Sequence, residues 1–219
     1  MRLRPVARDG TIVLMSPDRP EQLRVIRDEV LALTSSPLYA QRMETNAHPV
    51  IGEGSHWARV VFVGEAPGKN EAVSGRPFVG RAGKVLDELL ASADIQRSDI
   101  YITNIVKDRP PFNRDPLPEE IVAYGPFLDR QISIIQPDIL VPLGRYAMGY
   151  IMSAYGLQDQ LRPISAMHGR VLDATAPHGP IKIIPLYHPA VSIYNASTKP
   201  ILTEDIQVLR QFDCTPRVP

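Results

Sequence analysis

Four short apolar runs constrain the fold of this chain more than any other feature. They are Ala58–Gly64, Asp99–Ile105, Asp138–Leu143 and Ile181–Tyr187. None of them alternates between apolar and polar residues, which is typical of strands buried on both faces of a parallel sheet. Segments with helical periodicity separate the runs. The sequence therefore predicts an α/β fold, a three-layer α/β/α sandwich with a central four-stranded parallel sheet.

The segments with helical periodicity predict the helices that cover this sheet. Three follow strands: Arg81–Asp94, Glu119–Ile135 and Arg145–Ala154. We expect a leading helix over Pro20–Leu33, because proline suits the first helical turn. A closing helix is expected over Thr203–Phe212, with Thr203 as its cap.

The length of the chain favours one domain. A chain of 219 residues with 44% hydrophobic composition can build one well-packed core, so we expect a single domain over residues 1–219. The core is expected from about residue 20 to about residue 212, between peripheral tails at Met1–Arg19 and Asp213–Pro219. Basic and acidic residues both number 24, so any nucleic-acid contact must come from local patches.

The single cysteine, Cys214, excludes a disulfide framework and any metal site made of cysteines alone. No stretch approaches the roughly 18 apolar residues of a membrane span, and Met1–Arg8 lacks the apolar segment of a signal peptide. We therefore expect a soluble cytoplasmic protein with no membrane partner.

Polar and glycine-rich segments follow three of the predicted strands. Gly64–Gly68 forms a turn after the first, Thr103-Asn104 ends the second, and His188-Pro189 follows the last. Open α/β sheets bind their ligands at the carboxyl ends of the strands. Each segment alone is commonly structural: an ordinary strand-to-helix turn, a helix cap, or a histidine bonded to a loop carbonyl. Their combination predicts a ligand site.

Several motifs occur in one order: Gly64–Gly68, Gly75–Gly83, Thr103-Asn104, Lys107 with Arg109-Pro110-Pro111, and His188-Pro189. This pattern resembles the uracil-DNA glycosylase superfamily, specifically its family 4, over roughly Val50 to Phe212. The resemblance implies a DNA repair enzyme that flips uracil out of DNA and hydrolyses its N-glycosidic bond, leaving an abasic site. Its partner would be uracil-containing DNA, and we expect a monomer.

The resemblance implies four base-binding positions. Phe78 matches the aromatic residue that stacks on the flipped uracil, and the backbone of Ala66 matches a further contact to the base. Asn104 matches the amide that accepts from uracil N3–H and donates to O4, a pattern that cytosine reverses. Glu71 matches an acidic residue near uracil C5, where it would exclude the thymine methyl group.

Two catalytic positions follow from the same resemblance. His188 matches the histidine that faces uracil O2, where negative charge gathers as the bond to the sugar breaks. Glu65 matches an acidic residue near the sugar and the attacking water. A packing role for His188 is the ordinary alternative.

DNA contacts are implied for basic and apolar residues around these motifs. The candidates for phosphate contact are Arg76, Arg81, Lys107 and Arg109. Val191 or Ile193 could be the apolar wedge that fills the gap left by the flipped base. For each cation taken separately, a solvated surface charge is the commoner role.

The chain departs from family 4 at one module. Members usually hold a four-iron cluster on four cysteines, and the matching positions here carry Leu33, Ser36, Asp108 and Gly125. None of these can supply a thiolate, so we predict no metal and no cofactor. We expect Tyr39, Asp108 and Arg109 to pack or pair in the vacated space. This loss bears on DNA affinity more than on base chemistry.

Three alternatives stay open. The first is a protein that binds uracil-DNA without catalysis. The second is a glycosylase of wider range that also acts on hypoxanthine or xanthine, because purine access depends on pocket volume. The third is a phosphate or nucleotide binder that uses Gly64–Gly68 and has no need of Phe78, Asn104 and His188 together.

Overall fold

The computed structural model describes residues 18–218, so the predicted N-terminal tail lies almost wholly outside the described residues. The strands are β1 (Glu53–Gly54), β2 (Val60–Gly64), β3 (Tyr101–Asn104), β4 (Ile139–Pro142), β5 (Leu172–Ala176) and β6 (Gly179–Ile183). The α-helices are α1 (Arg19–Leu31), α2 (Tyr39–Thr45), α3 (Lys69–Ser74), α4 (Arg81–Ser92), α5 (Pro118–Ile135), α6 (Gly144–Ala154), α7 (Ile164–Met167), α8 (Val191–Tyr194) and α9 (Lys199–Ile206). Short 3-10 helices are η1 (Pro111–Asn113), η2 (Gln158–Gln160), η3 (Ala196–Thr198) and η4 (Gln207–Gln211).

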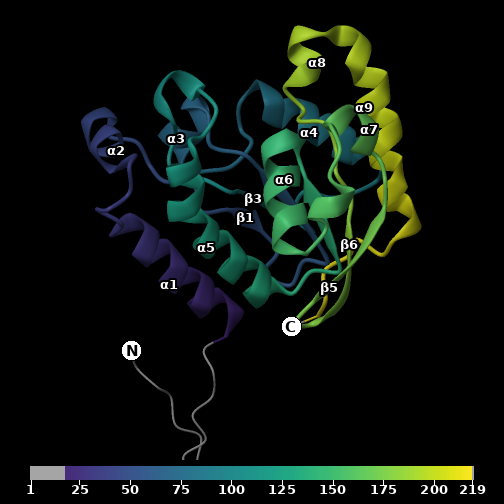
Figure 1. The fold of residues 1–219 in the computed structure, drawn as a ribbon, viewed down its shortest axis with the longest axis horizontal. Helices are drawn as coiled ribbons and strands as arrows, with labels where there is room; N and C mark the ends of the chain where they lie inside the picture. The colour runs from purple at the N-terminus through teal and green to yellow at the C-terminus, as the bar shows by residue number, and fades with distance from the viewer. Residues whose placement is uncertain (1–17, 219) are drawn as a thin grey trace, which may run out of the picture.

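The strands form one mixed sheet in the order β1-β3-β2-β4-β6-β5, with helices around it (Figure 1). The four predicted strands are its central members, and they pair in parallel. The edge strands β1 and β5 pair antiparallel with their neighbours, so the sheet has six strands rather than the four predicted. Neither edge strand has an unbroken apolar run, because β1 has two residues and β5 alternates between more exposed and less exposed side chains.

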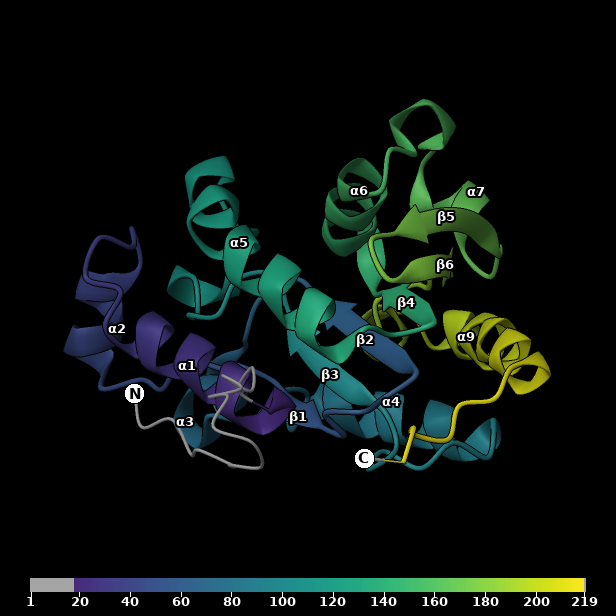
Figure 2. The ribbon, with the colours of Figure 1, turned by 90° about the horizontal axis from the view of Figure 1, so that it is seen from below.

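Helices pack on both faces of the sheet. Successive strand residues point to opposite faces, so Val61 joins a cluster with α1, α5 and α6, whereas Phe62 joins a cluster with α4 and α9. Figure 2 shows α5 and α6 on one side of the sheet and α4 on the other. The parallel strands are buried on both faces, which explains their unbroken apolar sequences.

Four predicted helices agree with α1, α4, α5 and α6 to within a few residues at each end. The closing helix was placed too late. It begins at Lys199 and continues as η4, so Thr203 is an interior residue rather than the cap. The Thr203 hydroxyl donates to the carbonyl of Lys199 at 3.0 Å, which is the local bond of a threonine inside a helix.

The carboxyl ends of the parallel strands meet at one edge of the sheet. Gly64 at the end of β2 lies beside Asn104 at the end of β3, and Leu143 after β4 pairs with Leu186 after β6. This register brings the segments after all four strands together. At the opposite end, the N–H of Arg217 donates to the carbonyl of Trp57 and so ties the C-terminal segment to the domain.

Candidate active site

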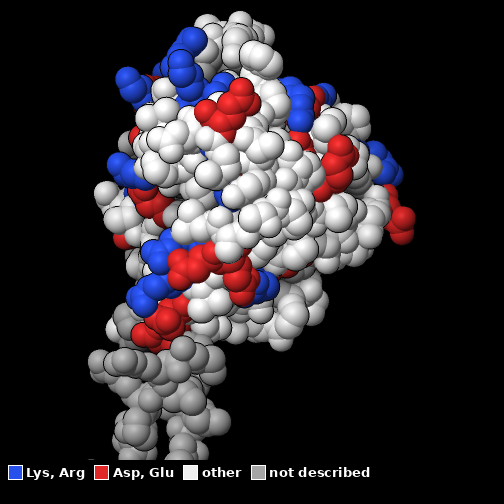
Figure 3. Space-filling view, turned by 90° about the vertical axis from the view of Figure 1, so that its left-hand side faces the viewer, with Lys and Arg blue, Asp and Glu red and all other residues white. Residues whose placement is uncertain are grey.

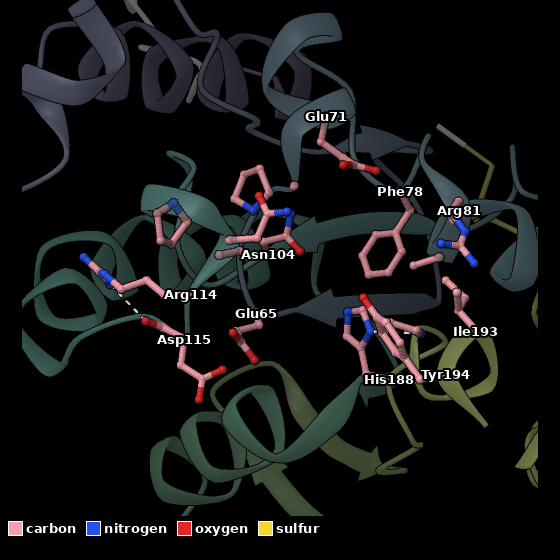
Figure 4. Close-up of a pocket in the computed structure, with 17 residues that line it drawn as sticks. Glu65, Glu71, Phe78, Arg81, Asn104, Arg114, Asp115, His188, Ile193 and Tyr194 are labelled. Atoms are coloured by element: carbon pink, nitrogen blue, oxygen red, sulfur yellow. Dashed lines mark hydrogen bonds between the residues drawn. The ribbon is translucent and has the colours of Figure 1, made fainter. Parts of the chain in front are cut away.

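A pocket of about 470 Å³ opens at this edge of the sheet. Eight of the sequence-predicted site residues line it: Glu65, Ala66, Glu71, Phe78, Arg81, Asn104, His188 and Ile193. Figure 4 shows His188 and Tyr194 on one side of the cavity and Arg114 and Asp115 on the other. The loop between β3 and α5 and the segment around α8 therefore form opposite walls.

The floor of the pocket requires a glycine. A Cβ atom on Gly64 would lie 2.2 Å from Asn104 Oδ1 and 2.8 Å from the Phe78 ring. Phe78 itself has a left-handed backbone with φ of 48°, and a Cβ on Gly83 would lie 1.9 Å from its carbonyl oxygen. The two glycines thus allow the aromatic ring and the amide to lie against the end of β2.

Asn104 is positioned through its backbone. Its carbonyl accepts from Lys107 Nζ at 2.7 Å, and the residue is 2% exposed at the end of β3. The amide group of the side chain lies at the pocket. The residue therefore brings one oxygen acceptor and two N–H donors to the pocket.

Glu71 shapes the loop that carries Phe78. Its Oε1 accepts from the backbone N–H groups of Val79 and Gly80, at 2.9 and 2.7 Å. These two bonds close the loop back on α3 and fix the peptide that follows Phe78. Glu71 therefore has a structural task besides lining the pocket, which the sequence did not indicate.

His188 is held as a neutral donor. Burial lowers the pKa of His188 to about 4, although the nearby Glu71 carboxylate acts in the opposite direction. The N–H of Ala190 donates to its Nδ1 at 3.2 Å, which leaves the proton of the neutral ring on Nε2. The His188 ring lies 5.6 Å from the Phe78 ring, centroid to centroid, so both face the same cavity.

Glu65 has an unusual environment for a carboxylate. Burial, followed by the negative charge of Asp115, raises the pKa of Glu65 to about 7, against an opposing effect of Arg145. Asp115 accepts from Arg145 Nη2 at 2.6 Å and from the Tyr146 hydroxyl at 2.8 Å. The Glu65 carboxyl group can therefore exchange a proton near neutral pH.

Asp115, Arg145 and Tyr146 did not emerge from the sequence as site residues. Asp115 lies in the proline-rich loop before α5, and the other two begin α6. The one available signal was that Gly144 follows a strand of the parallel sheet, as the other site segments do.

Four predicted DNA-contact residues lie outside the pocket lining. Arg76 is exposed and forms a two-pronged ion pair with Glu53. Arg109 donates to Asn113 Oδ1 at 2.6 Å, at the pocket wall. Val191 packs against the core cluster on the α4 side of the sheet, so of the two wedge candidates only Ile193 lines the pocket.

The prediction that Lys107 contacts a phosphate is wrong, because the side chain is buried. Lys107 is 0% exposed, and its Nζ donates to Thr103 Oγ1, to the Asn104 carbonyl and to Gln131 Oε1 at 2.6 to 2.9 Å. A fully buried cation cannot contact a phosphate. Its place next to Asn104 makes it a support of the pocket floor.

Charges of both signs are mixed on one face of the molecule. In Figure 3, basic and acidic side chains lie close together on the face that it shows, with uncharged surface between them. Arg114 beside the pocket is similarly neutralised by the buried carboxylate of Glu120 at 2.5 Å.

The positions matched to cluster cysteines carry a polar network instead. The Asp108 carboxylate accepts from Arg42 Nη1 at 3.2 Å and from the Tyr124 hydroxyl at 2.5 Å, and Tyr124 bonds Ser36 Oγ at 2.6 Å. A Cβ on Gly125 would lie 2.4 Å from the Tyr150 hydroxyl. Side chains fill this space and none offers a thiolate, so the residues present do not fit an iron–sulfur cluster.

This network agrees in part with the expected repacking. Asp108 pairs as expected, and Tyr39 packs against it through Arg42, whose guanidinium lies 5.0 Å from the Tyr39 ring centroid. Arg109 instead points to Asn113 in the pocket wall. Within residues 18–218, no group of three His, Cys, Asp or Glu side chains is placed to hold a metal ion, and no helix is long and apolar enough to cross a membrane.

Comparisons with known proteins point to one family. The family model of the uracil DNA glycosylase superfamily matches residues 51–210. The Type-4 uracil-DNA glycosylase of Sulfurisphaera tokodaii is 42% identical over 198 residues, 90% of this chain and 87% of that protein. The Type-4 uracil-DNA glycosylase of Thermotoga maritima is 42% identical over 196 residues, 89% of this chain and 96% of that protein. The chain belongs to the uracil-DNA glycosylase superfamily, and its resemblance to family 4 is confirmed.

Proposed function

We propose that this chain is a monofunctional uracil-DNA glycosylase, which hydrolyses the bond between uracil N1 and deoxyribose C1′ and leaves an abasic site. The observation that carries the proposal is one pocket that holds a base-reading amide (Asn104), an aromatic ring (Phe78) and a neutral histidine donor (His188). The names of its Type-4 relatives support the same reaction.

Uracil binds in this account with its ring on Phe78. The Asn104 amide pairs with N3–H and O4 of the base, and the Ala66 backbone provides a further bond. Glu71 lies at the C5 edge, where its carboxylate and the loop that it holds exclude the thymine methyl group. A flipped nucleotide is required, because the glycosidic carbon cannot be reached within the duplex.

Cleavage of the glycosidic bond leaves its electron pair on the base. The electron pair of the C1′–N1 bond moves onto uracil, and the His188 Nε2–H donates to O2 as negative charge develops there. The neutral form suits this role, because its proton stabilises the anion without being transferred at neutral pH. Glu65, as a carboxylate, stabilises the cationic sugar and takes a proton from the water that adds to C1′.

The remaining features of the proposal concern DNA. We infer that Arg81 and Ile193, which line the pocket, contact the backbone and the gap in the duplex, and that Arg76 and Arg109 are outer phosphate contacts. The helices on both faces of the sheet support a three-layer α/β/α arrangement. A single domain, a monomeric state, a cytoplasmic location and the absence of a cofactor remain predictions.

The structure disfavours the phosphate-binding alternative. The Glu71 carboxylate lies 2.7 Å from where a Cβ of Gly68 would stand, and Glu65 follows Gly64 in the same turn. A phosphate there would meet two carboxyl groups rather than open backbone N–H groups. Binding without catalysis and a wider base range are left for experiment to separate.

Strand cleavage after alkali treatment tests the proposal. Duplexes with a single U:G, U:A, T:G, hypoxanthine:T or xanthine:C pair, and a single strand with uracil, are compared at equal protein concentration. We expect cleavage at uracil and none at T:G. Tight binding of uracil-DNA without cleavage would establish the silent binder, and cleavage at the purines would establish the wider range.

A further inference from the structure

Phe112 stands out among the residues that directly adjoin the pocket lining in the sequence. Its side chain is 97% exposed, more than any other large apolar residue among residues 18–218. It belongs to η1, and the next residue, Asn113, lines the pocket. Single exposed apolar residues are common on protein surfaces, so exposure alone would mean little.

The backbone of Phe112 adds a second observation. Its φ of 56° and ψ of 18° lie in the left-handed region, and Asn113 has the same φ. This conformation is unfavourable for bulky L-residues and suits glycine. The chain therefore carries a large ring at a position whose backbone conformation favours glycine. Because the ring is almost fully exposed, no packing in the free protein offsets this conformational cost.

The loop around Phe112 is held in place. Pro110 and Pro111 restrict the backbone before it, and Arg109 Nε donates to Asn113 Oδ1 at 2.6 Å. Arg114 is fixed by two bonds to the buried Glu120 carboxylate, at 2.9 and 2.5 Å. The ring is thus presented to solvent from a stiff support rather than from a mobile loop.

The position of this loop points to what the ring meets. Pro110, Asn113 and Arg114 line the pocket wall opposite Tyr194, which is itself 87% exposed (Figure 4). One exposed aromatic residue, Tyr194, thus belongs to one wall, and another, Phe112, is the immediate sequence neighbour of Asn113 in the opposite wall. Flipping a base leaves neighbouring and opposite bases without a stacking partner, and aromatic rings stack on any base.

We propose that Phe112 is a positioning residue that stacks on a nucleobase of the DNA next to the flipped uracil, from the wall opposite α8. This inference rests on the proposed function, because it requires DNA over the pocket. It assigns to the loop between β3 and α5 a base contact in addition to its pocket-lining role.

The test compares Phe112→Gly and Phe112→Trp with the wild type and with Val25→Ala, a control at an exposed apolar residue of α1. Affinity is measured by fluorescence anisotropy on a duplex with 2′-fluoro-2′-deoxyuridine opposite guanine, whose glycosidic bond resists hydrolysis. We expect roughly tenfold weaker binding for Phe112→Gly, as the loss of one stacked base predicts, and near wild-type binding for Phe112→Trp and Val25→Ala.

Thermal unfolding separates this role from a structural one. Glycine suits the left-handed backbone, so Phe112→Gly should melt at or above the wild-type temperature while it binds DNA more weakly. Wild-type affinity in Phe112→Gly would overturn the inference. The inference would also be overturned if Phe112→Gly bound more weakly but melted at a lower temperature than the wild type, and Phe112→Trp behaved in the same way.

A second readout follows the base itself. With 2-aminopurine next to the fluorinated uridine, or opposite it, stacking on the ring quenches its fluorescence, so the signal of the bound Phe112→Gly complex should exceed that of the wild type. Wild-type cleavage of ordinary uracil duplexes is measured in parallel. If the protein cleaves uracil duplexes but its affinity for DNA does not depend on the Phe112 ring, this inference alone is overturned. If the affinity depends on Phe112 but no cleavage occurs, only the proposed catalysis is overturned.

Discussion

His188 shows how one residue acquires its chemistry from its surroundings. The Ala190 N–H occupies its Nδ1, and burial lowers the pKa of His188 to about 4, so at neutral pH the ring has a single proton, on Nε2. A neutral donor with low acidity stabilises a developing anion through a hydrogen bond without transferring its proton. The contribution of such a donor appears in the transition state rather than in substrate binding.

We predict that His188→Ala slows single-turnover release of uracil by about 100-fold or more, the usual effect of removing one such donor. Its affinity for the uncleavable duplex should stay within about threefold of the wild type. His178→Ala is a matched control, because that histidine bonds the carbonyl of Pro137 and does not line the pocket. An equal loss in binding and in rate would place His188 in ground-state recognition.

The Glu65 carboxyl group predicts a pH profile. Because burial and Asp115 raise the pKa of Glu65 to about 7, and the proposed reaction uses the carboxylate, the single-turnover rate should fall as pH drops through about 7. Asp115→Asn removes a charge that raises this pKa, so the midpoint should move to lower pH. Glu65→Gln should be slow and lack this step. An unchanged midpoint in Asp115→Asn would contradict the assignment.

The site residues that belong to local sequence motifs could be predicted, and those fixed by distant contacts could not. Phe78, Asn104 and His188 lie where their sequence motifs place them, around one pocket. Lys107 reads as a surface cation because its acceptor Gln131 lies 24 residues further along the chain, on α5. No local pattern reveals such a partner.

At the scale of elements, the loop from β3 to α5 depends on the buried network at its start. Arg42 of α2 donates to Asp108 and to the carbonyls of Val30 and Leu31, so it joins the end of α1 to this loop. The Arg42 and Asp108 side chains are 5% and 2% exposed. A pair buried to this extent matters mainly when one partner is removed, because the other is left as an unpaired charge.

Arg42→Met should lower the free energy of unfolding by about 3 to 5 kcal/mol, measured by urea denaturation. Arg130→Met, which breaks the surface pair of Arg130 with Glu29, should cost less than about 1 kcal/mol. The double variant Arg42→Met, Asp108→Leu should recover part of the loss, since no charge remains buried. A cost below about 1 kcal/mol for Arg42→Met would show that the network does not hold the loop.

The same scale explains which elements sequence analysis found. Strands buried on both faces leave unbroken apolar runs, and α5 leaves an amphipathic pattern over five turns. The edge strand β5 is less buried than the central strands, and it pairs with β6, its partner in a hairpin. The other edge strand, β1, is only two residues long. Their positions depend on pairing with the rest of the sheet rather than on their own composition.

For the whole molecule, zero net charge must be reconciled with DNA binding. Several cations near the pocket already have acidic partners, among them Arg76 with Glu53 and Arg114 with Glu120. The number of phosphates neutralised should therefore be small, and the affinity for DNA should depend weakly on salt.

We predict that Arg81→Ala lowers the slope of log Kd against log salt concentration by about one unit, because Arg81, which lines the pocket, is proposed to contact one phosphate. Arg130→Ala, on the surface pair with Glu29, should leave the slope unchanged. The slopes come from anisotropy titrations with the uncleavable duplex. Equal slopes for both variants and the wild type would remove Arg81 from the DNA interface.

The most direct test of the central claim is to count products. A U:G duplex is incubated with excess wild-type protein, and free uracil and abasic sites are quantified in the same sample by mass spectrometry. We predict one free uracil for each abasic site, and no free thymine from the matched T:G duplex. Tight binding of the uracil duplex without free uracil would contradict it and leave a binding protein in place of an enzyme.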